Sequence, residues 1–157
     1  MKEDGRRRER NGQSMKKDDA EILREVQRSA EMAMHAIDTM AEKVYDDGLA
    51  MQMSRQSLKY SEIRNRALNR LLQNRGEPCR TSQVSRLLRA GEIHAQTLLD
   101  VSTGRIAELL IQNSSRGVTG VCRALNHYRL AGSGSQEIAR ELVDFEEAAI
   151  EVLKQYL

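Results

Sequence analysis

Apolar residues recur at steps of three and four through most of this chain, and this spacing constrains the fold more than any other feature. Such steps place side chains on one face of an α-helix. The only proline, Pro78, and an aromatic content of 3% also favour helix over sheet. The clearest stripe is Ile138, Leu142, Phe145, Ala149, Val152 and Tyr156. We therefore predict an all-α fold, an antiparallel bundle of four to five helices.

Turn signals divide this pattern into helices. The sequence Asp46–Asp47–Gly48 separates a first helix over about 18–46 from a second over about 49–74. The intervening turn is short, so these two helices should form an antiparallel hairpin. We expect Gly48 to take the left-handed conformation that ends helices. Capping boxes are predicted at Asp18 with Glu21 and at Ser133 with Gln136, the latter opening the last helix.

A single helix over 81–128 would be about 70 Å long at the usual rise per residue, which is far longer than its neighbours. We therefore expect a break. The preferred position is 100–104, because Ser102 and Thr103 are good caps and Gly104 weakens a helix. This leaves residues 81–99 as a shorter connecting helix. A rival break lies at 113–117.

The first seventeen residues differ from the rest of the chain. Seven basic and three acidic side chains give this tail a net charge of +4, so residues 18–157 carry −2 of the chain's +2. The tail lacks apolar residues between Met1 and Met15, which predicts disorder over 1–17 and one bundle domain over 18–157. A solvated leader is preferred to a basic arm that binds RNA, DNA or an anionic surface. Translation starting at Met15 is a further hypothesis.

The remaining composition suggests where the protein works. Its two cysteines, Cys79 and Cys122, do not make a disulfide framework and are expected to be reduced thiols. No apolar run approaches the roughly 18 residues of a membrane span. We expect a cytoplasmic protein without a membrane partner. Nucleic acid is an unlikely partner because the domain itself is not basic.

Segments in the second half resemble a family of small uncharacterised proteins from Gram-positive anaerobes. The matching segments are Ile106–Gln112, Gly117, Ala124–Tyr128, Phe145–Glu147 and Leu153–Leu157. The resemblance covers residues 15–157 and is weakest in the first hairpin. It implies a ferritin-like helix order. That family has no assigned activity, so the resemblance implies no site residues.

Metal and catalytic motifs are not evident. Ferritin-like di-metal sites need Glu-x-x-His on two helices, and this chain has none. His35, four residues after Glu31 and three before Asp38, has ligand spacing but reads as a solvated ion pair. Five methionines in the first hairpin read as adaptable core and interface filler: Met32, Met34, Met40, Met51 and Met53. We predict no catalytic, cofactor-binding or metal-binding residues, and no enzyme activity.

Residues 113–120 are the least regular stretch of the helical pattern. Asn113, Ser114, Ser115, Gly117 and Gly120 put small and polar groups on an expected buried face. Close approach of two helices, a buried polar network or ligand pocket, and a simple loop break are three open interpretations.

Three functions fit these observations. The first is a non-enzymatic bundle that acts by association with itself or with another protein. The second is a degenerate ferritin-like bundle that binds a metal or small ligand. The third is weak binding of nucleic acid through the basic tail.

Overall fold

Five α-helices and a closing turn make up the computed structural model, which describes residues 2–80, 83–97 and 101–157. No strand occurs in these ranges, so the all-α prediction is confirmed. The elements are α1 (Lys2–Ala41), α2 (Asp47–Gln73), α3 (Gln83–Thr97), α4 (Thr103–His127), α5 (Ser133–Leu153) and the 3-10 turn η1 (Lys154–Tyr156).

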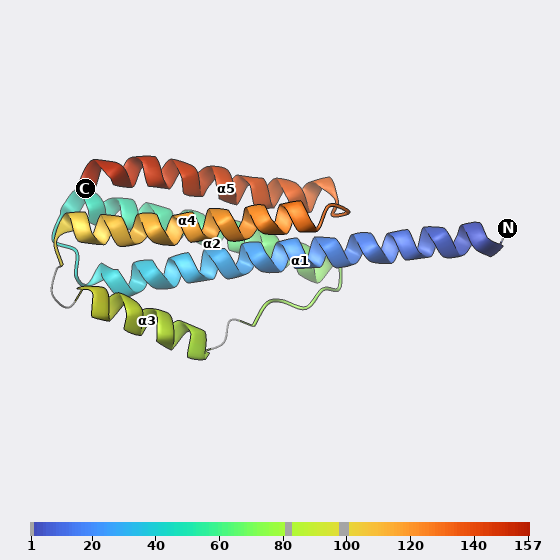
Figure 1. The fold of residues 1–157 in the computed structure, drawn as a ribbon, viewed down its shortest axis with the longest axis horizontal. Helices are drawn as coiled ribbons and strands as arrows, with labels where there is room; N and C mark the ends of the chain where they lie inside the picture. Colours follow the sequence, from blue (N-terminus) through green and yellow to red (C-terminus); the bar gives the residue numbers. More distant parts are fainter. Residues whose placement is uncertain (1, 81–82, 98–100) are drawn as a thin grey trace.

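Four long helices lie side by side, and the shorter α3 lies outside them (Figure 1). α1 packs against α2, α4 and α5, and α5 also packs against α2 and α4. α1 and α5 run in one direction, whereas α2 and α4 run in the other (Figure 1). α3 returns the chain from the end of α2 to the start of α4. The predicted antiparallel bundle with a shorter connecting helix is therefore confirmed, with the ends of that helix at 81–82 and 98–99 outside the described residues.

The core is formed by the inner faces of the four long helices. Its largest fully buried side chains are Ile22, Leu23, Met40, Leu49, Met53, Tyr60, Ile63, Leu71, Ile106, Leu142, Leu153 and Glu146. In the last helix, Ile138, Leu142 and Ala149 of the predicted stripe are buried. Leu153 is buried where the pattern selects Val152, which is only half-buried. Two further positions differ by one residue because the inner residue is polar. Ser114 is buried where the pattern selects Asn113, and Glu146 is buried where it selects Phe145.

The first turn differs from the prediction. α1 ends at Ala41, and Asp46 is the N-cap of α2, where its side chain accepts a hydrogen bond of 2.7 Å from the Leu49 amide. Gly48 lies inside the first turn of α2 and does not have a positive φ. The prediction of a left-handed cap at Gly48 is wrong because aspartate at 46 starts the second helix rather than ending the first.

The break that the long pattern requires lies before α4. Ser102 caps this helix by accepting a hydrogen bond of 3.2 Å from the Arg105 amide. α4 then continues without interruption to His127, so the rival break at 113–117 is wrong. A buried glycine such as Gly117 costs a helix only about 1 kcal/mol, which packing against neighbouring helices offsets.

Residues 1–17, for which the sequence predicts a disordered tail, include the start of α1. The backbone is helical from Lys2, and this end of α1 projects beyond the other helices (Figure 1). Extending an existing helix needs no new nucleus.

Two aspartates of α1 fix the turn between α4 and α5. Oδ2 of Asp18 accepts a hydrogen bond of 3.0 Å from the Leu130 amide, and Oδ1 of Asp19 accepts one of 2.9 Å from the Gly132 amide. Gly132 is the N-cap of α5, and Gln136 donates to the Ala131 carbonyl. Both predicted capping boxes are therefore wrong, because α1 has no helix start at Asp18 and a residue of α1 supplies the acceptor at the start of α5.

Within the described ranges, no helix combines the length and the apolar content needed to cross a bilayer.

Candidate functional site

A buried polar cluster lies inside the bundle where α2, α4 and α5 meet. Tyr60 of α2 donates a hydrogen bond of 2.6 Å to Oε2 of Glu146 on α5. The Ser114 hydroxyl of α4 lies 3.4 Å from the Tyr60 hydroxyl. Exposed fractions are 1% for Tyr60, 2% for Ser114 and 1% for Glu146. We call these three residues, together with Gly117, the Glu146 cluster.

The position of Glu146 changes its proton affinity. Burial favours the neutral acid and raises the pKa of Glu146 to about 7, although the hydroxyls of Tyr60 and Ser114 oppose that rise. Burial also raises the pKa of Tyr60 well above its usual value, and the negative charge of Glu146 adds to this effect. Oε1 of Glu146 is buried and has no hydrogen-bond partner among the described residues. The cluster is therefore a buried proton-binding group that titrates near neutral pH.

Gly117 provides the room for this carboxyl group. A Cβ atom at position 117 would lie 2.5 Å from Oε1 and 3.2 Å from Cδ of Glu146. Glycine is thus needed here for the close approach of a side chain, while the backbone itself is ordinary helix. At Gly120, about one turn later, a Cβ would lie 2.6 Å from Oε1 of Glu25 on α1, but this carboxyl ends a partly exposed, flexible side chain that can move aside.

These contacts decide between the three interpretations of residues 113–120. Ser114 belongs to a buried polar network, and Gly117 allows a close approach, so both of these interpretations apply at adjacent turns. Asn113 is half-buried and accepts a hydrogen bond of 3.4 Å from Arg89, whereas Ser115 is exposed and donates to the Ile111 carbonyl. The sequence pointed to the right segment but missed Glu146. Its spacing from Leu142 and Ala149, four and three residues, was the available signal.

Gln56 adds a second unsatisfied polar group to the core of α2. It is 5% exposed, and its Nε2 has no hydrogen-bond partner among the described residues. It lies one helical turn before Tyr60 and so on the same face. Steps of four and three residues from Met53 to Tyr60 would instead place its neighbour Ser57 on the inner face, but Ser57 is only half-buried.

Three large apolar side chains are exposed on the outer face of the same helix. Leu58 is 73% exposed, Leu72 61% and Met51 56%. These residues and Asn65 are spaced seven apart, so they lie in one line along α2. We call these four residues the α2 stripe. Beside it, a groove of about 470 Å³ between α1 and α2 is lined by Asp38, Ala41, Ser54 and Leu58, among others.

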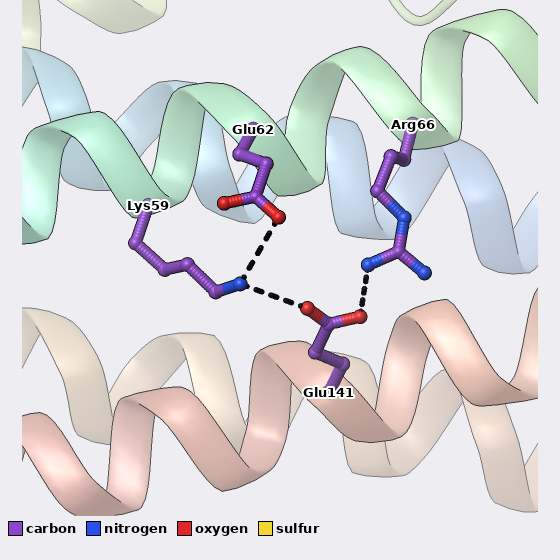
Figure 2. Close-up of polar contacts among 4 residues, drawn as sticks. All are labelled: Lys59, Glu62, Arg66 and Glu141. Atoms are coloured by element: carbon purple, nitrogen blue, oxygen red, sulfur yellow. Dashed lines mark hydrogen bonds and ion pairs between the residues drawn. The ribbon is translucent and has the colours of Figure 1, made fainter.

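An ion-pair network borders the α2 stripe on the side of α5 (Figure 2). Lys59 bridges Glu62 at 3.2 Å and Glu141 of α5 at 3.0 Å, and Arg66 also pairs with Glu141. The hydrogen bonds that Lys59 donates to Glu141 and Glu62 raise the pKa of Lys59. Partial burial opposes ionisation of Glu141, but Lys59 and Arg66 nevertheless lower its pKa. The network joins α2 to α5 and holds Glu62 beside the stripe.

The residues considered as metal ligands do not converge. His35 has its Nε2 3.1 Å from the Arg86 carbonyl oxygen of α3. Among the described residues, no group of three or more histidine, cysteine or acidic side chains has the geometry to hold a metal ion. Glu31, His35 and Asp38 therefore do not form the mononuclear site that their spacing allowed.

The cysteines and methionines have structural surroundings. Cys79 is half-buried, and its backbone amide and carbonyl both pair with the side chain of Gln27, which fixes the segment after Pro78. Cys122 is also half-buried. Met40 and Met53 belong to the core, as the interpretation as filler predicts, whereas Met51 belongs to the α2 stripe.

No family model matches this chain, and comparisons with curated proteins and with solved structures also give no match. The resemblance to a ferritin-like family remains an expectation from the sequence.

Proposed function

We propose that this chain is a non-enzymatic helical bundle that acts by association with a protein through the α2 stripe. The observation that carries the proposal is the exposure of Leu58, Met51 and Leu72 in a line along one helix. Single exposed apolar residues are ordinary, but a line at seven-residue spacing is the pattern with which one helix packs against another. The α2 stripe is therefore an exposed line of apolar side chains that is interrupted at Asn65.

The core of the bundle does not need these side chains. Leu49, Met53, Tyr60 and Ile63 already fill the inner face of α2. An exposed leucine contributes little to folding, whereas covering it removes apolar surface from water at about 25 cal/mol per Å². The α2 stripe is therefore surface that association would stabilise and that folding leaves uncovered.

A photo-crosslinking amino acid placed at position 58 tests this proposal. The matched control is position 130, because Leu130 is 55% exposed but lies in the turn between α4 and α5. We expect one discrete crosslinked product from position 58, in cells or with the purified chain, and none from position 130. Mass spectrometry of the product identifies its second component. Absence of a discrete product at position 58 in both settings would overturn the proposal.

A further inference from the structure

The α2 stripe belongs to a longer seam. Adding the residues three positions after each stripe member gives alternating steps of three and four residues, the 3.5-residue period of a coiled coil. The seam consists of Met51, Ser54, Leu58, Ser61, Asn65, Leu68 and Leu72. Ser54 is exposed, and Ser61 and Leu68 are half-buried, so these positions lie at the edge of the stripe. At 1.5 Å per residue the seam is roughly 30 Å long.

Charged residues next to the seam indicate what covers it. Arg55 and Glu62 are seven residues apart, so they occupy the same flank of the seam, on the side of α5 (Figure 2 shows Glu62 there). In an antiparallel helix pair, equivalent flanks of the two helices face each other. A two-fold axis midway between Leu58 and Ser61 then places Arg55 of each copy opposite Glu62 of the other.

The same axis gives matched layers for six of the seven seam residues, from Met51 to Leu68, whereas Leu72 lies beyond the matched stretch, opposite Asp47 of the second copy. Met51 faces Leu68 of the second copy, so an apolar side chain meets an apolar one. Leu58 faces Ser61, so a large side chain meets a small one. Ser54 faces Asn65, and these two side chains can hydrogen bond. Every layer occurs twice, because a two-fold interface uses the same patch on both copies.

The other flank is complementary too. Arg64 occupies the flank on the side of α1, and within its own chain it donates hydrogen bonds only to the neighbouring Asn65 among the described residues. The axis places it opposite Ser57 of the second copy, at the groove that Asp38 lines. Neither Arg55 nor Asp38 makes an ion pair with another described residue of its own chain. A parallel pair would instead oppose Arg55 to Ala50 and Glu62 to Ser57, which are both uncharged.

We propose that a second copy of this chain covers Met51, Leu58 and Asn65 of the α2 stripe, with its own α2 packed antiparallel about an axis between Leu58 and Ser61. This inference rests on the proposed function and names the partner in it. The interface carries four symmetric ion pairs, two between Arg55 and Glu62 and two between Arg64 and Asp38. Asn65 in the seam fixes the register, because a shifted register would bury its amide without a partner.

Charge reversal with mixing tests the arrangement. In a dimer of the R55E variant, the acidic residue at position 55 of each copy faces Glu62 of the other. In a dimer of the E62R variant, the basic residue at position 62 of each copy faces Arg55 of the other. We expect each variant alone to self-associate about tenfold more weakly than the wild type in sedimentation equilibrium. The equimolar mixture should recover wild-type affinity as a heterodimer, because both of its pairs are again of opposite sign. The double variant R55E/E62R should recover as a homodimer.

The controls separate charge pairing from loss of fold. Arg105 and Glu108 form an exposed pair on α4, and E108R should leave association unchanged. If E62R fails to fold because Lys59 loses a partner, E62Q takes its place and should bind R55E more tightly than R55E binds itself. A mixture no tighter than its single variants would overturn the inference, as would a crosslinked product from position 58 that contains a different protein. In the second case the proposed function would still stand.

Discussion

Oη of Tyr60 donates a hydrogen bond of 2.6 Å to Oε2 of Glu146, and both side chains are almost completely buried. The bond joins α2 to α5 across the core, and the ring of Tyr60 also packs edge-on against Phe145 with centroids 4.9 Å apart. Hydrogen bonds to an ionised group are stronger than neutral ones, whereas an uncompensated buried charge is costly. The balance between these two effects makes the stability of the bundle depend on pH.

Glu146→Gln should remove a pH dependence of unfolding. The pKa of Glu146 is raised from 4.5 to about 7 in the folded chain, so the native state binds the proton more tightly than the unfolded state does. The stability that the proton contributes is full below about pH 4.5 and is lost as pH rises to about 7. The shift corresponds to about 3 kcal/mol. Urea unfolding at pH 5 and pH 8 measures it.

The matched control for this prediction is Glu151→Gln, an exposed acid on the same helix that pairs with Lys154. Its pH profile should follow the wild type. If the wild type and Glu146→Gln lose stability equally between pH 5 and pH 8, Glu146 does not titrate in the core as described.

Tyr60→Phe should cost more stability at pH 8 than at pH 5. The ring and its packing remain, so the loss is the hydroxyl bond, which is about 1.5–3 kcal/mol for a charged acceptor. At pH 5 Glu146 is protonated and the lost bond is a weaker, neutral one. Because the Tyr60 hydroxyl lowers the pKa of Glu146, its removal should raise that pKa further. Tyr45→Phe is the control, since Tyr45 is 84% exposed. Equal costs at the two pH values would contradict this explanation.

Gly117→Ala should destabilise the bundle although alanine is the better helix former. The new Cβ would lie 2.5 Å from Oε1 of Glu146, so the carboxyl must move away from Tyr60. Gly91→Ala in α3 is the matched control, because its Cβ would meet nothing within 4 Å. It should stabilise by about 0.5–1 kcal/mol. In a Glu146→Ala background, Gly117→Ala should become stabilising. Thermal unfolding of the four variants checks this, and destabilisation that persists without Glu146 would exclude the clash as its cause.

The helical class and the core faces could be predicted from sequence because three- and four-residue spacing is a local property of the chain. On the inner face of α2, Leu49, Met53, Ile63 and Leu71 are buried, as their helical spacing predicts. The pattern fails at Gln56, Ser114 and Glu146, where a polar residue occupies an inner position. At such places a pattern based on hydrophobicity assigns the inner position to an apolar neighbour such as Phe145. The pattern cannot do otherwise, because hydrophobicity carries no information about hydrogen-bond partners on other helices.

The helix caps show the same limit of sequence-based prediction, because here the sequence predicts local hydrogen bonds that the structure does not contain. Asp18, Asp19 and Ser133 have the composition of helix starts, yet Asp19 supplies the acceptor at the start of α5 from another helix. A capping motif read along the chain assumes that donor and acceptor are a few residues apart. In this bundle they are 113 residues apart, so only the packing of α1 beside the α4–α5 turn could reveal the bond.

By itself, therefore, the sequence determined that this chain forms long amphipathic helices, where most of them turn, and that residues 113–120 would be unusual. The tertiary structure decided that Glu146 lies against Gly117 within reach of Tyr60, and that Leu58 stays outside the core. The physical reason is that periodicity fixes which face of a helix is apolar, whereas the proton affinity of a buried acid and the exposure of a leucine depend on which other helix lies against that face.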